Sequence, residues 1–263
     1  MTSTLPSRLS REEMGELIMG QCPNPACDRL NLAEAKICDR CGSPLFLKER
    51  YRVLRYLGSG GFATTFEAID EQRLNTACVI KQFAPDLEKT ANFHFLKYLF
   101  EQEAEILTKV GSHPQIPGLL AFFEQSGCSY IVQELIHGWD LFTELSDRGS
   151  FEESQIWQLL NDLLPVLQFI HEQQIIHRDI KLGNILRQPD GKLALIDFGS
   201  SQKLGISTTS TILAPHHPIV ATPGYAAPEQ MEGKVYPASD LYSLGVTVIR
   251  LLTGCLPESD GSE

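Results

Sequence analysis

Two acidic side chains and one amide stand close together in the second half of the sequence. Asp179 and Asn184 belong to the segment His-Arg-Asp-Ile-Lys-Leu-Gly-Asn, and Asp197 begins Asp-Phe-Gly, 18 positions after Asp179. A carboxylate can accept a proton, and carboxylate and amide oxygens are the ligands that magnesium prefers. The pattern therefore predicts Asp179 as a general base and Asn184 and Asp197 as oxygen ligands of a metal ion.

A glycine-rich segment lies upstream, at Gly58-Ser-Gly-Gly-Phe-Ala-Thr-Thr-Phe66. Glycine-rich turns let backbone amides approach phosphate oxygens closely, although any tight hairpin also uses glycine. A strand is expected to follow the segment, whereas a helix follows the loop of a dinucleotide-binding fold. Lys81 ends the next apolar strand, where it is either a solvated strand tip or a lysine that reaches the same phosphates.

A carboxylate falls on the apolar stripe of a predicted helix. Glu103 lies between Phe100 and Leu107, which belong to that stripe. A carboxylate that points inward needs a partner, because burial of an unpaired charge is costly. Lys81 is the expected partner, and Glu105 is expected to face solvent.

Four of the seven cysteines fall within twenty residues: Cys22, Cys27, Cys38 and Cys41. Two close pairs can supply four thiolates in a tetrahedron, the arrangement that structural Zn²⁺ favours. A redox dithiol and incidental cysteines are the alternatives, but a redox motif is expected on a βαβ framework that the sequence does not show. We expect a zinc ribbon whose metal supplies the folding energy that so short a segment cannot obtain from a core. The other three cysteines are expected to be small buried apolar residues.

The elements that must position these residues change from strands to helices along the chain. Strands are predicted at 51–58, 64–70, 76–83, 121–123, 130–135, 185–187 and 193–196, and helices at 92–110 and 239–253. A further long helix should start at a capping box, Ser150–Glu153, and be kinked or split by Pro165. A small β-rich part followed by a larger helical part indicates an α+β fold with two lobes.

Composition restricts the function further. The 263 residues are 43% apolar and 21% charged, which is typical of a globular protein and excludes global disorder. The net charge of −11 argues against general binding of a nucleic-acid backbone. No apolar run reaches the roughly 18 residues of a membrane helix, and the N-terminus lacks a signal peptide's apolar core, so we expect a cytoplasmic protein without a membrane segment.

From Tyr51 to about Pro257 the chain resembles a eukaryotic-type (Hanks-type) serine/threonine protein kinase. It carries the glycine-rich loop, strand lysine, helix glutamate, His-Arg-Asp, Asp-Phe-Gly and Ala-Pro-Glu motifs in the family's order, the last ending at Glu229. Lys181, two residues after Asp179, resembles the serine/threonine branch. The preceding ribbon resembles that of the cyanobacterial four-cysteine kinases, which implies a bacterial signalling enzyme.

The resemblance implies ATP-dependent phosphorylation of serine and threonine hydroxyls on protein substrates. Asp179 would deprotonate the acceptor hydroxyl, Lys181 would neutralise charge on the transferring group, and Lys81 would hold phosphates while paired with Glu103. Asn184 and Asp197 would hold Mg²⁺ or Mn²⁺. The residues implied for nucleotide binding are Gly58, Ser59, Gly60, Gly61, Phe62, Ala63, Thr65, Lys81, Glu134, Ile136, Asn184 and Asp197.

The resemblance also implies a domain organisation. We expect a flexible leader at 1–20, the ribbon at 21–47, and a kinase domain at 48–263 with an N-lobe at about 48–134, a hinge at about 134–138 and a C-lobe at about 139–263. The family continues for several helices beyond this point and pairs the Ala-Pro-Glu glutamate with an arginine there, so Glu229 is expected to have no partner. The alternative function is therefore a truncated, weakly active or inactive module that binds nucleotide or acts as a scaffold. The ribbon is a candidate docking site for a partner.

By the same resemblance, two further residues have structural roles. Asp240 resembles the buried aspartate that anchors the catalytic loop through backbone amides. Thr222 resembles a threonine near the substrate-docking loop, and a structural role is expected for it.

Overall fold

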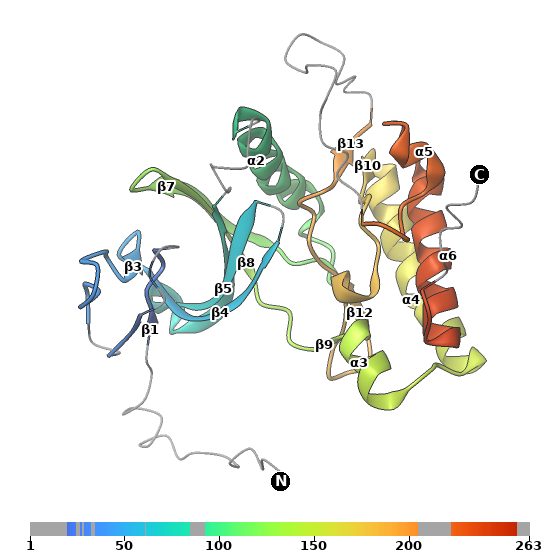
Figure 1. The fold of residues 1–263 in the computed structure, drawn as a ribbon, viewed down its shortest axis with the longest axis horizontal. Helices are drawn as coiled ribbons and strands as arrows, with labels where there is room; N and C mark the ends of the chain where they lie inside the picture. The colour runs from blue at the N-terminus through green and yellow to red at the C-terminus, as the bar shows by residue number, and fades with distance from the viewer. Residues whose placement is uncertain are drawn as a thin grey trace. The chain divides into compact units, whose positions relative to one another are not determined.

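A computed structural model describes residues 20–24, 27, 29–32, 35–60, 62–84, 93–204 and 222–256 (Figure 1). The chain divides into two compact units, one of residues 1–90 with 120–135 and one of residues 91–119 with 136–263. The predicted leader up to residue 19, Gly61 and the last residues from 257 lie outside the described residues.

The first unit is built on an antiparallel sheet of six strands. Their order is β3 (Phe46–Leu47), β4 (Tyr51–Gly60), β5 (Ala63–Asp70), β6 (Thr76–Phe83), β8 (Cys128–Glu134) and β7 (Leu119–Gln125). A short 3-10 turn, η1 (Glu71–Arg73), joins β5 to β6. One face of the sheet buries an apolar cluster that includes Tyr51, Phe66, Ile80 and Tyr130. The strand positions confirm those predicted from the sequence to within a few residues.

The cysteine-rich segment packs directly on this sheet. It contains a two-residue hairpin, β1 (Gly20–Gln21) with β2 (Leu30–Asn31), and β1 contacts β4. The backbone N–H of Tyr56 donates a hydrogen bond to Oε1 of Gln21 at 2.6 Å. The ribbon is thus attached to the strand that leads into the glycine-rich segment.

The second unit is mainly helical. Its helices are α2 (Phe93–Val110), α3 (Leu141–Arg148), α4 (Glu153–Glu172), α5 (Pro228–Met231) and α6 (Pro237–Thr253), and α4 and α6 run side by side (Figure 1). Short strands form two small antiparallel sheets: β9 (Trp139–Asp140), β11 (Ile185–Arg187) and β12 (Leu193–Leu195) in one, β10 (Ile175–Ile176) and β13 (Gln202–Lys203) in the other. A 3-10 turn, η2 (Leu182–Asn184), precedes β11.

Three details differ from the expectations. Helix α4 starts at Glu153 and not at a Ser150 cap, because the side chain of Gln155 accepts the backbone N–H of Glu152. The helix is not split at Pro165, which lies on its exposed side, where water can satisfy the carbonyl left without a donor. Cys255 is exposed and not buried.

In the described part of the chain, every helix is too short or too polar to span a lipid bilayer.

Candidate active site and cysteine cluster

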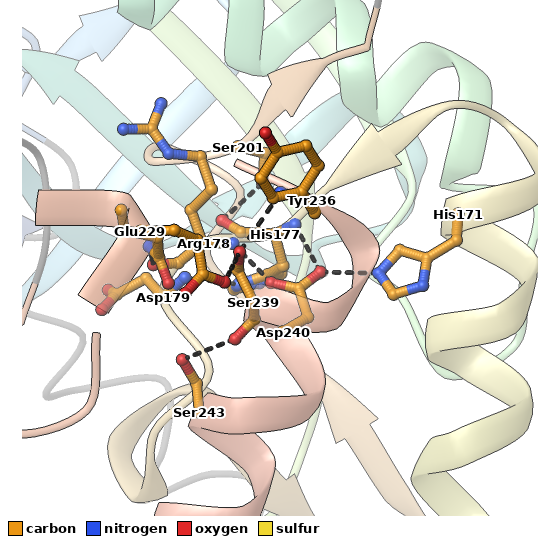
Figure 2. A network of polar contacts seen from close by, with 11 residues as sticks. His171, His177, Arg178, Asp179, Ser201, Glu229, Tyr236, Ser239, Asp240 and Ser243 are labelled. Atoms are coloured by element: carbon orange, nitrogen blue, oxygen red, sulfur yellow. Dashed lines mark hydrogen bonds and ion pairs between the residues drawn. The ribbon is translucent and has the colours of Figure 1, made fainter. Parts of the chain in front are cut away.

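A single buried carboxylate fixes the backbone of the His-Arg-Asp segment. Asp240, on α6, is fully buried, and its Oδ1 accepts the N–H of Arg178 at 2.8 Å while Oδ2 accepts that of His177 at 2.9 Å (Figure 2). Nε2 of His171, on α4, lies 2.7 Å from the same Oδ2. The prediction that Asp240 anchors this loop through backbone amides is confirmed, and His171 is a partner that the sequence analysis missed.

The His-Arg-Asp and Asp-Phe-Gly segments each contain a backbone conformation that other residues must hold in place. Arg178 has φ = +70° and Asp197 has φ = +66°, in the left-handed region that residues with a Cβ rarely adopt. Each such residue costs on the order of 1–3 kcal/mol, and they persist where surrounding contacts over-determine them. Gln230 contributes by donating its Nε2–H to the carbonyl of Arg178 at 3.1 Å.

Three side chains converge on the carboxylate of Asp179. Nζ of Lys181 lies 2.8 Å from Oδ2, and Nδ2 of Asn184 donates to the same oxygen at 2.9 Å. The hydroxyl of Thr222 donates to Oδ1 at 2.5 Å and accepts from Nζ of Lys181 at 3.0 Å. Asp179 is therefore held in one orientation by a cation, an amide and a hydroxyl.

The two predicted oxygen ligands are positioned on either side of the β11–β12 hairpin. The carbonyl of Asn184 accepts the N–H of Ile196 at 2.9 Å, which ties the start of the hairpin to the residue before Asp197. Nδ2 of Asn184 is used by Asp179, which leaves the amide oxygen as the atom available to a cation. A carboxylate and an amide oxygen are a donor set that fits Mg²⁺.

Glu103 lies against the Asp-Phe-Gly segment. It is buried on α2, and a Cβ at Gly199 would come within 3.1 Å of its Oε2. Gly199 also donates its N–H to Oδ1 of Asp197 at 3.3 Å. The absence of a side chain at Gly199 thus allows Glu103 and Asp197 to approach the same backbone. The expectation that Glu105 faces solvent is confirmed, and its exposed carboxylate also pairs with Nζ of Lys203 at 2.5 Å.

His177 is completely buried beneath this loop. Burial lowers the pKa of its imidazole, against the raising effect of the Asp240 carboxylate. Nε2 lies 3.2 Å from the carbonyl of Ile196, and Nδ1 lies 3.4 Å from the backbone N of Asp179. A neutral ring with its proton on Nε2 satisfies both contacts, and its edge packs on Phe198 at 4.8 Å between ring centroids.

The expectation that Glu229 has no partner is wrong. The hydroxyl of Ser239, in the first turn of α6, donates to Oε1 of Glu229 at 2.6 Å, and this bond lowers the pKa of the carboxyl (Figure 2). This pair could not be predicted from the sequence, because a serine near the start of a helix is common and does not indicate which distant residue it contacts.

Most of the nucleotide-binding candidates lie on strands of the first unit, and Ile136 belongs to the second unit. Gly58, Ser59 and Gly60 pair in register with Thr65, Thr64 and Ala63 across the β4–β5 hairpin. Lys81 lies opposite Thr65 on β6 and is buried. Glu134 ends β8, and Ile136 follows it in the chain. Their roles, and the pairing of Lys81 with Glu103, stay predictions.

The four cysteines come together as expected. Their Sγ atoms all lie within 4.8 Å of one another. Two of the separations are 3.5 Å, between Cys22 and Cys41, and 3.7 Å, between Cys27 and Cys38. Sulfur atoms at about 2.3 Å from a tetrahedral Zn²⁺ would be about 3.8 Å apart, so these separations fit that ion.

The surroundings of the sulfurs complete the cluster. Gly42 has φ = +72° and donates its N–H to the carbonyl of Cys38 at 3.0 Å. This bond closes the turn that carries Cys38 and Cys41, the second knuckle of the cluster. Nδ2 of Asn31 lies 3.7 Å from Sγ of Cys38, and its Oδ1 accepts the N–H of Asp39. The Ser43 hydroxyl lowers the pKa of Cys41 to about 6. These groups stabilise thiolate character at the second knuckle.

The sequence of this chain was compared with protein families and with known proteins. The profile of the protein kinase domain matches residues 51–263. The chain is 43% identical to serine/threonine-protein kinase B of Synechocystis sp. over 91% of its own length and 43% of that protein's. It is 44% identical to serine/threonine-protein kinase PknA of Nostoc sp. over 81% of the chain and 38% of that protein, and 44% identical to serine/threonine-protein kinase C of Synechocystis sp. over 81% and 40%.

The match to kinase B extends beyond the kinase domain. Residues 51–263 are 213 of 263, so an alignment over 91% of the chain must include residues ahead of Tyr51. The chain spans only about two fifths of the length of these three relatives. Both the profile and the relatives show that the chain belongs to the protein kinase domain family.

Proposed function

We propose that this chain transfers the γ-phosphoryl group of ATP to serine or threonine hydroxyls of protein substrates. The observation that carries the proposal is the set of contacts around Asp179, whose carboxylate is held by Lys181, Thr222 and Asn184. A carboxylate fixed in this way is oriented before the acceptor hydroxyl arrives. Serine/threonine kinase activity in the named relatives agrees with the proposal.

In the proposed reaction, Asp179 accepts the proton of the acceptor hydroxyl. The hydroxyl oxygen then forms a bond to the γ-phosphorus while the bond between that phosphorus and the ADP oxygen breaks. Lys181, whose Nζ is 2.8 Å from Oδ2 of Asp179, places a positive charge beside the transferring group. Phosphoryl transfer needs mainly positioning and charge stabilisation, so these contacts are the protein's main contribution.

The remaining candidate residues have roles in holding the nucleotide. Asn184 and Asp197 would hold Mg²⁺, or Mn²⁺ in its place, and the ion neutralises charge on the phosphates. Lys81 would contact the α- and β-phosphates and pair with Glu103. The backbone of the glycine-rich segment would cover the phosphates, and the residues proposed for this and for adenine binding are Gly58, Ser59, Gly60, Gly61, Phe62, Ala63, Thr65, Glu134 and Ile136.

The four cysteines are proposed to bind one structural Zn²⁺. Support comes from the convergence of the Sγ atoms and from their separations of 3.5 and 3.7 Å. We further propose the domain limits of the sequence analysis, with the ribbon at 21–47 and the kinase domain at 48–263. The ribbon's exposed side would be the place where a partner docks.

A measurement of phosphate transfer tests the enzymatic proposal against a scaffold. The chain is incubated with radiolabelled ATP, Mg²⁺ and a mixed pool of serine and threonine peptides, and is compared with Asp179→Asn. Loss of the base should lower the rate by at least about 100-fold. Asp190→Asn, in the exposed turn between β11 and β12, is the matched control and should keep the full rate. Equal labelling by the chain and Asp179→Asn would leave the scaffold as the function.

A further inference from the structure

One arginine of α6 is held between two aromatic rings. The guanidinium carbon of Arg250 lies 5.3 Å from the ring centroid of Phe142, on α3, and 5.8 Å from that of Tyr225. Its Nη1 donates a hydrogen bond to the hydroxyl of Tyr225 at 2.6 Å. Two rings and one hydrogen bond fix the orientation of the guanidinium, so its remaining donors point in defined directions.

Among the residues that the structure describes, no acidic side chain pairs with Arg250. Within the described residues, no carboxylate lies within 4 Å of its guanidinium, and its buried Nε has no hydrogen-bond partner. Arg187, in the same unit, differs in this respect, because its Nε is 2.7 Å from Oε2 of Glu144. A partly buried cation with unused donors is costly unless an anion supplies the missing bonds.

A chain of contacts connects Arg250 to the proposed base. Tyr225 belongs to a turn that starts at Thr222, since its N–H donates to the carbonyl of Thr222 at 3.1 Å. The hydroxyl of that threonine donates to Oδ1 of Asp179. Through Tyr225 and this turn, Arg250 is therefore linked to the residue that orients the proposed base.

We propose that Arg250 selects protein substrates that carry an acidic side chain a few residues from the acceptor serine or threonine. This inference rests on the proposed kinase function. An extended peptide advances about 3.3 Å per residue, so four residues span about 13 Å, and this is the range on either side of the acceptor in which the acidic side chain is expected. Phe142, which is 49% exposed, leaves one side of the pair of rings open to such a peptide. The contact is a charge-assisted hydrogen bond in a partly desolvated place, which is stronger than a surface ion pair.

The proposal is tested with peptides that contain one acceptor serine. A single Glu, Lys or Ala is placed at each position up to about four residues on either side, and kcat/KM is measured at about 0.15 M ionic strength. Screening at this ionic strength reduces the influence of the chain's net charge of −11. We expect one position at which Glu raises kcat/KM about three- to tenfold over Ala and Lys lowers it. Phosphoserine at that position shows whether a phosphate serves as well as a carboxylate.

Charge variants of Arg250 identify the residue responsible. Arg250→Lys should keep the preference, Arg250→Gln should abolish it, and Arg250→Glu should reverse it in favour of Lys, while the all-Ala peptide is phosphorylated by all three. Arg148→Gln is the matched control, because Arg148 is a largely exposed arginine of α3 that pairs with Glu144. It should retain the preference for Glu.

A binding measurement separates this inference from the kinase proposal. Peptides with Ala in place of the acceptor serine are titrated by fluorescence anisotropy, which does not depend on phosphate transfer. Preferred binding of the Glu peptide to the native chain and to Arg250→Lys, lost in Arg250→Gln, supports the inference even if no peptide is phosphorylated. Equal affinities for the Glu and Ala peptides, or a preference that persists in Arg250→Gln, would overturn it.

Discussion

The hydroxyl of Ser239 donates a hydrogen bond to Oε1 of Glu229 at 2.6 Å, and so links the first turn of α6 to the short helix α5. The bond lowers the pKa of Glu229. The Ala-Pro-Glu motif is therefore held by a residue directly beside Asp240, the anchor of the catalytic loop. Helix α6 therefore holds both the Ala-Pro-Glu motif, through Ser239, and the His-Arg-Asp segment, through Asp240.

Ser239→Ala should reduce the free energy of unfolding by about 1 kcal/mol near neutral pH. Since the folded state lowers the pKa of Glu229, this stability is present above the ordinary glutamate pKa of about 4.3 and is lost as the pH falls through the lower folded value. Urea unfolding at several pH values measures the difference. Ser243→Ala is the control, because Ser243 donates to the uncharged carbonyl of Tyr225 and its cost should not change with pH. A Ser239→Ala deficit that stays constant into acid would contradict the role of the charge.

Thr222→Ala should lower kcat by about tenfold or more and leave the KM for ATP nearly unchanged. The hydroxyl connects Oδ1 of Asp179 to Nζ of Lys181, so its loss frees both groups to adopt unproductive orientations. Steady-state kinetics with a peptide substrate measure the two constants. Thr222→Ser retains the hydroxyl and should recover most of kcat. A serine variant as slow as the alanine variant would show that the methyl group, and not the hydrogen bond, is what matters.

His177→Phe should flatten the dependence of stability on pH below about 6.5. Burial lowers the pKa of His177 in the folded state, so the unfolded chain binds a proton that the folded chain does not. Stability from this group is therefore full above about pH 6.5 and declines as the pH falls, by at most about 1.4 kcal/mol per unit. Unfolding between about pH 5.5 and pH 7.5 measures the slope. His137→Gln, at an exposed histidine, should keep the native slope, and a His177→Phe slope equal to the native one would exclude His177 as its source.

Removal of one cysteine ligand should release the metal from the ribbon. We expect about one Zn²⁺ per chain by elemental analysis, and a Zn²⁺ affinity weakened more than about 100-fold in Cys38→Ser. The metal-free chain should also unfold at a lower temperature, because ion binding contributes folding energy to this segment. Cys255→Ser, at an exposed cysteine that is not one of the four ligands, should keep the metal. Zinc bound equally well by Cys38→Ser would exclude the four-thiolate site.

Most of the secondary structure was predictable because it depends on local pattern. The strands around the glycine-rich segment and helix α2 follow from alternation and helical periodicity in a few residues, and their bounds agree closely with the prediction. The predicted start of α4 was wrong because the sequence offers two overlapping capping boxes, Ser150–Glu153 and Glu152–Gln155. In the structure the helix begins after Glu152, whose N–H is accepted by the side chain of Gln155. Helix α4 is continuous through Pro165, so the expected split is absent, and periodicity alone does not reveal that this proline lies on the exposed side of the helix.

By itself, the sequence determined the order of the motifs, the family, the base Asp179 as a candidate, and the four cysteines as a candidate metal site. Only the tertiary structure decided which side chains meet: Ser239 with Glu229, Thr222 with Asp179, and Arg250 with Tyr225. These partners are separated by 10 to 43 positions along the chain. A hydrogen bond requires atoms about 3 Å apart in a defined direction, and for residues so distant in sequence that geometry is set by how the helices and loops pack.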